Sequence, residues 1–305
     1  MSSPVLPIFH LRRGQHHVEV FDPRPDPRAL GARYVHGGYI ATWSVGGRCL
    51  TSGPTRYWTE YGGRGLPETF EIPLAWAVVK EQESFLRIGA GQLRKNGLNG
   101  DDGSTRTALT ATLAWAVVSH DENHITMRTQ DGTELMNGVI RYELERTVRL
   151  HDDGVESITT MTLRCPRLAH HPIGWFAHPF FAQTSLSATA ATIPGALIVT
   201  GSAPNPLWKP GVEALSQGSD GRWRFAPSGY SRSTLGNLWG TTPTITVDLD
   251  PALGGGHVAI TVDRPLDHLV VWGAGHVFSP EPKLSRLWLD GETASWALRY
   301  RFTPT

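Results

Sequence analysis

Residues 170–183 read HHPIGWFAHPFFAQ, a run of aromatic and small apolar residues with His178 near its centre. Side chains two apart share a face of a β-strand, so the alternation predicts a strand with two distinct faces. One face would carry Trp175, Ala177, Pro179 and Phe181, and the other would carry Phe176, His178 and Phe180. Because Pro179 has no N–H for a ladder, we expect an edge or a bulge that turns His178 into a cleft.

His178 has two interpretations at this point. It is a catalytic group presented by a strand, or it is a core histidine whose ring nitrogens are satisfied internally, since imidazole is intermediate in its preference for burial. The aromatic residues and the proline around His178 favour a functional site.

The composition predicts one large all-β domain that spans residues 1–305. The chain is 40% hydrophobic, which is enough to bury a sizeable core. Its 33 glycines and 22 prolines mark frequent turns. All-β sandwiches often use such a length in a single domain, so we expect a large antiparallel β-sandwich.

Short segments rich in Val, Ile, Thr, Trp and Tyr recur between turn signals, which is typical of an all-β sandwich or barrel. The expected strands are residues 17–21, 38–45, 109–119, 124–129, 140–150, 155–164, 173–182, 244–249, 257–263, 268–272 and 296–302. Asp-Gly pairs in TMRTQDGTEL (126–135) and VRLHDDGVESI (148–158) predict two hairpins that frame a central meander. Residues 204–233 are the expected irregular insertion, with Trp208, Trp223 and Tyr230 as apolar anchors.

Charge and cysteine content exclude several classes of partner. Basic and acidic residues number 28 each, so no global field attracts nucleic acid or an anionic membrane. Cys49 and Cys165 match no metal spacing, and reduced thiols explain them more simply than a disulfide.

The amino terminus lacks a basic region followed by a long apolar run, and we expect a cytoplasmic protein. A homodimer could form through a sheet edge, but the sequence does not indicate where.

Several histidines belong to the residue type that transition metals prefer. They are His170, His171, His257, His268 and His276. None has HExxH or a comparable spacing, so the sequence predicts no metal and no cofactor. His276, five residues before Glu281, is the one expected near a binding site.

Six stretches carry a resemblance through their order along the chain. They are GGYIATWSVGGRCL (37–50), GGRGLPETFEI (62–72), RIGAGQLRKNG (87–97), RYELERTVRL (141–150), AHPFF (177–181) and SPEPKLSRLWLDGETASWALRYRF (279–302). This order resembles the galactose mutarotase-like superfamily, and its aldose 1-epimerase-related branch more than a standard galactose mutarotase. The resemblance covers about Gly31 to the end. It implies a large antiparallel β-supersandwich whose open face binds a sugar ring, without a metal.

The resemblance also implies a catalytic pair. Interconversion of sugar anomers needs an acid and a base at one hemiacetal. In the superfamily, a histidine of an HPYF-like strand is the acid and a glutamate of a late strand is the base. AHPFF matches the first through His178, and SPEP matches the second through Glu281. We expect these groups on opposite sides of a cleft one sugar ring wide. The alternative for Glu281, which lies between Pro280 and Pro282, is a surface-loop carboxylate.

One departure concerns the substrate. Standard mutarotases carry a second histidine in an NGLHGG-like loop, whereas residues 91–103 here read GQLRKNGLNGDDG and contain none. Arg94, Lys95 and Asn96 are the expected substrate contacts in this loop, since the arginine fork suits hydroxyls, carboxylates or phosphates. The alternative for Arg94 and Lys95 is a solvated hairpin end.

Other expected substrate contacts come from acidic and aromatic residues. One of Glu68 and Glu71 is expected to line the cleft and the other to be solvated. Most of the 11 tryptophans are expected in the core, but exposed indoles stack well on sugars. The aromatic candidates for the cleft are Trp175, Phe180, Trp239 and Trp272.

Three function classes remain open from the sequence. The first is an aldose 1-epimerase-like isomerase that uses His178 and Glu281, and the retention of both residues favours it. The second is a non-catalytic carbohydrate-binding or regulatory protein on the same scaffold, which the missing loop histidine favours. The third is a lyase or isomerase that applies the same pair to another small molecule.

Overall fold

The computed structural model consists of β-strands and two short 3-10 turns, with no α-helix among the described residues. It describes residues 7–25, 27–52, 63–71, 80, 83–94, 109–135, 138–165, 171–185, 188–194, 197–198, 215–225, 231–236, 238, 241–274 and 276–305. Several residues singled out from the sequence lie outside these ranges, namely Lys95, Asn96, His170, Trp208, Tyr230 and Trp239. The expected all-β fold is confirmed.

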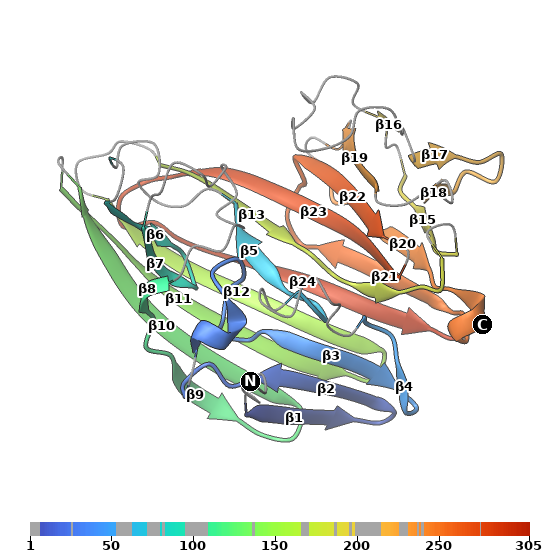
Figure 1. Cartoon of the computed structure of the whole chain (residues 1–305), viewed down its shortest axis with the longest axis horizontal. Helices are drawn as coiled ribbons and strands as arrows, with labels where there is room; N and C mark the ends of the chain where they lie inside the picture. Colours follow the sequence, from blue (N-terminus) through green and yellow to red (C-terminus); the bar gives the residue numbers. More distant parts are fainter. Residues whose placement is uncertain are drawn as a thin grey trace.

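Two large antiparallel sheets form the body of the molecule (Figure 1). The ten-stranded sheet has the order β17 (Leu215–Gln217), β18 (Trp223–Phe225), β15 (Ala190–Thr192), β20 (Ile245–Asp248), β21 (His257–Val262), β24 (Thr293–Thr303), β12 (Gly154–Arg164), β11 (Gly138–His151), β10 (His124–Leu135) and β9 (Ala116–His120). The seven-stranded sheet has the order β16 (Leu197–Ile198), β19 (Ser231–Gly236), β22 (His268–Ala274), β23 (Val277–Trp288), β13 (His171–Ala177) and β5 (Glu68–Phe70), and β14 (Phe181–Ala182) pairs with β23.

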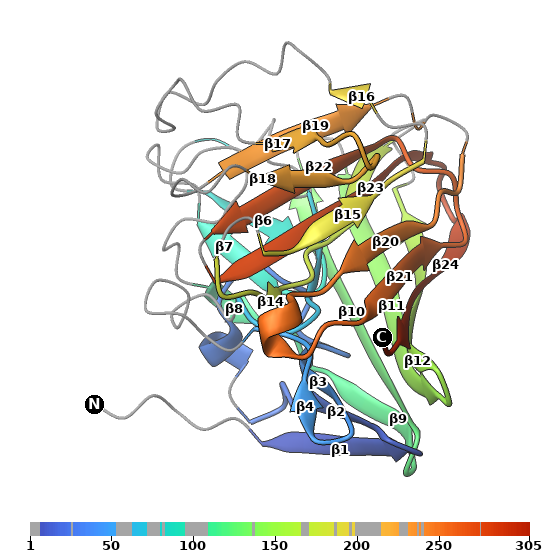
Figure 2. The same cartoon turned by 90° about the vertical axis from the view of Figure 1, so that its right-hand side faces the viewer.

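Two smaller sheets complete the described structure. The N-terminal sheet joins β1 (Ile8–Arg13), β2 (His16–Phe21), β3 (Ile40–Val45) and β4 (Arg48–Cys49), and the other joins β6 (Ser84–Arg87), β7 (Gly91–Arg94) and β8 (Leu109–Thr112). The 3-10 turns are η1 (Pro27–Leu30) and η2 (Pro251–Leu253). The N-terminal sheet lies beside β9 (Figure 2), where Arg12 N–H donates to the carbonyl of Glu122.

The main core fills the space between the two large sheets. Trp296 of β24 packs edge-on against Phe70 of β5 and Trp175 of β13, with ring centroids 6.1 and 5.7 Å apart. Tyr300 of β24 packs in the same way against Phe181 of β14. Burial of these large aromatic rings is the main force that holds one sheet on the other.

The predicted hairpins had different outcomes. Residues 148–158 form the expected hairpin, because β11 ends at His151 and pairs there with Gly154 of β12. The Asp-Gly turn predicted at Asp131 and Gly132 is wrong, since β10 runs through both residues and pairs them with β11. A Cβ at position 132 would lie 2.8 Å from Arg141 Cγ, so glycine permits a close approach of strands there rather than a turn.

Two other expectations are corrected. Residues 109–119, expected as one strand, belong to β8 and β9, because the first part pairs with β7 and the second with β10 in a different sheet. The supposed irregular insertion 204–233 contains the β17–β18 hairpin and the start of β19, and its anchor Trp223 is buried.

Cys49 and Cys165 are both free thiols. In the described ranges, no helix has the length and apolar character needed to cross a membrane.

His36, between η1 and β3, makes folding sensitive to acid. Its ring is fully buried, and its Nε2 donates to the carbonyl of Gly31 at 2.7 Å. Burial lowers the pKa of His36 from 6.5 to about 4. Below pH 6.5 the unfolded chain binds a proton that the folded chain does not, so stability falls as the pH drops from 6.5 to about 4.

We expect the loss of unfolding free energy from His36 to approach about 3 kcal/mol at pH 4, at about 1.4 kcal/mol per pKa unit. Urea denaturation across this pH range measures it. The His36→Gln variant should show a shallower decline than the parent chain, and equal slopes in both proteins would contradict this assignment.

Candidate functional site

The site is built where the ladder between β23 and its neighbour is interrupted. Residues 171–176 of β13 pair with residues 283–288 of β23, and β14 pairs with Val277 and Phe278. On that side, residues 279–282 form no described ladder pair. This break in the ladder contains or faces three prolines, Pro179, Pro280 and Pro282. A missing backbone N–H costs little there, because no ladder hydrogen bond is lost. The expected irregularity at Pro179 is therefore found, as a gap between β13 and β14.

Alternation along β23 places three polar side chains on one face. Phe278 lies in the core between the large sheets, so Ser279, Glu281 and Lys283 point to the opposite face. All three are buried. The surface-loop alternative for Glu281 is wrong, because this residue lies within β23 and pairs with Val270 of β22.

The same rule assigns the two faces of the run around His178. Trp175, Ala177 and Phe181 belong to the core between the large sheets, whereas Phe180 belongs to a second apolar cluster with Tyr34 and Trp272. His178 packs against Phe180, so it lies on the face of this second cluster. The alternation read from the sequence is confirmed.

His178 and Glu281 meet directly. His178 Nε2 lies 3.2 Å from Glu281 Oε1, and the two side chains are 3% and 6% exposed. The other ring nitrogen, Nδ1, lies 2.8 Å from Ser279 Oγ. The imidazole is therefore fixed from both edges, and a proton on Nε2 would point at the carboxylate. The expectation of a cleft one sugar ring wide between the pair is wrong, because the two groups are in contact.

Aromatic rings surround the imidazole of His178. The ring of Phe180 stacks on it, with centroids 4.5 Å apart and planes 22° apart. Trp272 and Tyr34 meet it edge-on at 5.7 and 6.0 Å. These rings restrict the imidazole to one orientation and keep bulk water away, which strengthens the interaction between ring and carboxylate.

Lys283 ends the polar row of β23. Its Nζ lies 2.5 Å from Glu71 Oε1 and 4.4 Å from the ring centroid of Phe176. The Glu71 side chain is 36% exposed and crosses above Gly174, where a Cβ would lie 3.0 Å from the carboxylate. Glu71 is thus partly accessible on the sheet that carries the pair, and it is held by an ion pair.

Glu68 lies on the other face of the sheet. Its carboxylate accepts a hydrogen bond from Arg146 Nη2 at 2.6 Å and another from the indole N–H of Trp175 at 3.0 Å. Glu68 pairs with Ala177 in the ladder, so its side chain and that of Trp175 share the core face, away from His178. Both residues belong to a buried polar cluster, and we do not propose them as substrate contacts.

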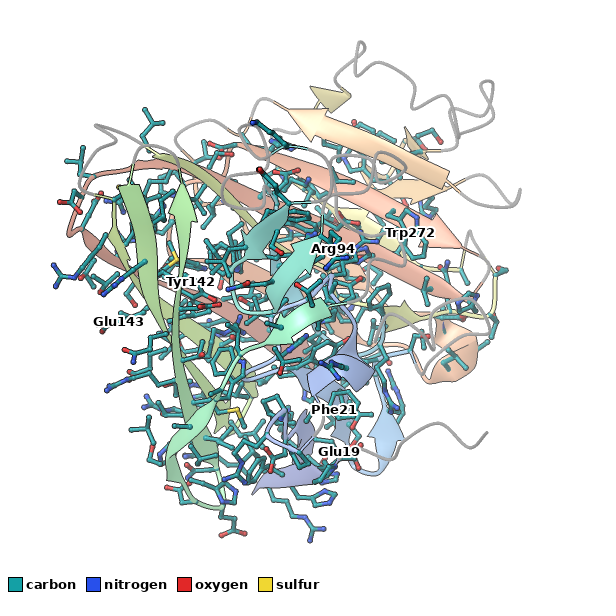
Figure 3. The ribbon with its side chains drawn as sticks, turned by 60° about the vertical axis from the view of Figure 1, so that its left-hand side comes forward. Glu19, Phe21, Arg94, Tyr142, Glu143 and Trp272 are labelled. Carbon is teal, nitrogen blue, oxygen red and sulfur yellow. The ribbon has the colours of Figure 1, made fainter. Side chains whose placement is uncertain are left out.

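The remaining candidates are spread over the fold. Arg94 ends β7 with an exposed side chain, in the three-stranded sheet, whereas Trp272 lies in β22 next to β23; Figure 3 labels both. His276 is exposed, and partial desolvation lowers the pKa of its ring. The interpretation from the sequence missed Ser279, Lys283 and Tyr34. Two-residue spacing from Glu281 was the available signal for the first two.

Comparison with known proteins gives the fold and no more. No family model and no curated protein matches the chain. An Escherichia coli K12 structure described provisionally as an aldose 1-epimerase matches at 15% identity and TM-score 0.63, covering 99% of this chain and all of that one. A galactose mutarotase-related enzyme from Lactobacillus acidophilus matches at 13% identity and TM-score 0.59, covering 98% of each chain.

A galactose mutarotase-like protein from Lactobacillus casei ATCC 334 matches at 14% identity and TM-score 0.60, over 97% of this chain and all of that one. The chain therefore has the galactose mutarotase-like fold, as the order of its motifs predicted. Fold does not determine function, so the activity must be argued from the site.

Proposed function

We propose that the chain is a carbohydrate isomerase of the aldose 1-epimerase type, with His178 as general acid and Glu281 as general base. The observation that carries the proposal is the 3.2 Å contact between His178 Nε2 and Glu281 Oε1. This contact joins two groups that can each give or take up a proton. Both groups are buried, and the imidazole is already held in one orientation. The names of the structural neighbours support a sugar as the substrate.

Both reacting oxygens of a hemiacetal are bonded to one carbon, so an acid and a base that lie side by side can reach both oxygens once the sugar replaces their mutual contact. Glu281 removes the proton of the anomeric hydroxyl while His178 donates a proton to the ring oxygen. The bond between the anomeric carbon and the ring oxygen breaks, and the open chain has a free carbonyl. After rotation of the carbonyl, the reverse transfers close the ring on its other face, and the protons and electrons balance.

Surrounding residues receive supporting roles in this proposal. Phe180 and Trp272 contact the imidazole and exclude water from it. Lys283 follows Glu281 on the same face of β23 and pairs with the partly exposed Glu71, and we propose that this pair contacts sugar hydroxyls. Arg94, His276, Lys95 and Asn96 stay predictions as substrate contacts. We further infer a single domain, because the main core cluster includes residues from β1 to β24. A cytoplasmic location is proposed as well.

Ser279 is a positioning residue, and its removal should have a graded effect. The Ser279→Ala change deletes the oxygen that holds His178 Nδ1 at 2.8 Å. We expect kcat to fall by roughly fivefold, because a typical hydrogen bond contributes about 1 kcal/mol, while KM changes little. The Ser279→Thr variant, which keeps the hydroxyl, should recover part of the rate. A KM effect with unchanged kcat would contradict a positioning role.

The proposed activity is tested by NMR measurement of anomer interconversion over a panel of aldoses, uronates and sugar phosphates. Thermal shifts with the same panel detect binding independently of turnover. We expect at least one sugar to show both accelerated anomer exchange and a stabilising shift. Binding without acceleration across the panel would favour a carbohydrate-binding protein instead.

A further inference from the structure

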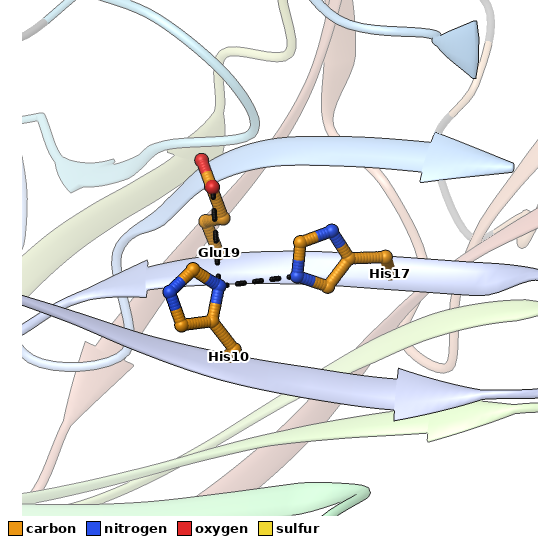
Figure 4. Close-up of side chains that lie close together, drawn as sticks. All are labelled: His10, His17 and Glu19. Atoms are coloured by element: carbon orange, nitrogen blue, oxygen red, sulfur yellow. Dashed lines mark hydrogen bonds and ion pairs between the residues drawn. The ribbon is translucent and has the colours of Figure 1, made fainter. Parts of the chain in front are cut away.

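We propose a transition-metal site of the zinc type on the β1–β2 hairpin, formed by His10, His17 and Glu19 (Figure 4). One donor atom from each side chain lies within 4.8 Å of the other two. The donors are His10 Nδ1, His17 Nε2 and Glu19 Oε1. This site is independent of the proposed isomerase activity, because it lies in the N-terminal sheet and not beside β23.

The register of the hairpin brings the three side chains to one face. His10 pairs directly with Glu19, and His17 is two residues before Glu19 on the same strand. The intervening residues Leu11 and Val18 are completely buried on the opposite face. The folded hairpin therefore presents the ligands together, without the long loop closure that a dispersed site would need.

The donor spacing is close to that of a coordination shell. His10 Nδ1 and His17 Nε2 are 3.1 Å apart, and Glu19 Oε1 lies 3.9 Å from His10 Nδ1. In tetrahedral zinc sites with metal–nitrogen bonds of about 2.0–2.1 Å, the ligand nitrogens are roughly 3.3 Å apart. The His10 side chain is 51% exposed, so its ring can rotate to aim its lone pair at a shared ion.

A second residue orients the carboxylate. Thr42 of β3 pairs with Glu19, and its hydroxyl donates to Glu19 Oε2 at 2.8 Å. Oε1 is left on the side of His10. Such outer partners orient ligands and tune metal affinity in known sites. Thr42 also links the proposed site to a third strand.

Charge and donor type select the class of metal. Arg12 pairs with His17 on this face, and its positive charge disfavours a bound cation. The negative charge of Glu19 offsets this repulsion. Two imidazoles with one carboxylate suit zinc, nickel or copper, whereas magnesium and calcium prefer oxygen ligands. A bound ion would tie β1 to β2 and stabilise the sheet.

Calorimetric titration of zinc chloride into the tag-free, metal-stripped full chain tests this site. We expect one ion per chain with micromolar or tighter affinity, and a rise in thermal midpoint of roughly 5 °C at saturation. The His10→Ala and His17→Ala variants should each weaken binding roughly tenfold or more, with a smaller loss for Thr42→Val. Magnesium chloride should produce no shift.

His257→Ala is the matched control, because His257 Nδ1 lies 2.6 Å from Asp248 Oδ1 in a partly exposed pair that has only one histidine. This variant should bind zinc as the parent does. Two results would overturn the proposal: no stoichiometric zinc binding by the parent chain, or binding that is unchanged in both His10→Ala and His17→Ala. In the second case the ion would occupy another site.

Discussion

Replacement of Glu281 by glutamine is expected to slow anomer exchange by at least about 100-fold, because positioned acid–base groups typically contribute about 10² to 10⁴ in rate. Glutamine keeps the size of glutamate and can still contact His178 Nε2, but it cannot take up the hydroxyl proton. His178→Ala should cause a comparable loss. His178→Ala also removes a buried ring and the partner of the Glu281 carboxylate, which costs stability, so rates are compared only where the variant is folded.

NMR exchange rates on the most responsive sugar of the panel measure this effect, and circular dichroism confirms folding. Glu143→Gln is the matched control, because Glu143 is an exposed carboxylate of β11, on the ten-stranded sheet (Figure 3). It should exchange anomers at the parent rate. Full activity in both Glu281→Gln and His178→Ala would end the assignment of the pair.

The largest effect on stability is expected from Glu68→Gln. Arg146 and Glu68 form an ion pair whose side chains are 2% and 1% exposed. The change leaves the Arg146 guanidinium as an uncompensated buried charge, which typically costs about 3 to 5 kcal/mol of unfolding free energy. Urea denaturation at pH 7 measures this loss.

Glu145→Gln serves as the control for Glu68→Gln. It breaks the pair of Arg128 and Glu145, whose side chains are 58% and 33% exposed, and such pairs contribute little to stability. The double variant Glu68→Leu with Arg146→Met should recover part of the lost stability, because no unpaired charge then remains. If Glu68→Gln unfolded at the same urea concentration as Glu145→Gln, the buried pair would not have the assigned role.

Local alternation in the sequence was sufficient to predict which face His178 occupies. The period of two depends only on the neighbouring residues, so alternation alone assigned Trp175 and Phe180 to opposite faces of the strand. The break at Pro179 followed equally from the chemistry of one residue, since proline cannot donate to a ladder. The Asp153–Gly154 hairpin was predicted on the same local basis.

Contacts across the sheets could not be predicted in this way. The Asp131–Gly132 pair has the composition of a turn, but the pairing with β11 forces an extended strand through it. Glu68 was expected in a cleft or in solvent, and only the position of Arg146, 78 residues later in the chain, explains its burial. Ser279 acquires its role from its 2.8 Å contact with His178, which lies 101 residues earlier in the chain, in the gap between β13 and β14.

The central claim is that His178 and Glu281 act as one unit on one hemiacetal, and a double-variant comparison tests it most directly. The measurement is the NMR anomer-exchange rate of the parent chain, His178→Ala, Glu281→Gln and the combined variant on the same sugar. Groups that act together give strongly non-additive losses, so we predict that the combined variant is about as slow as either single variant. Independent, multiplicative losses would contradict the account, and so would single variants that keep the parent rate.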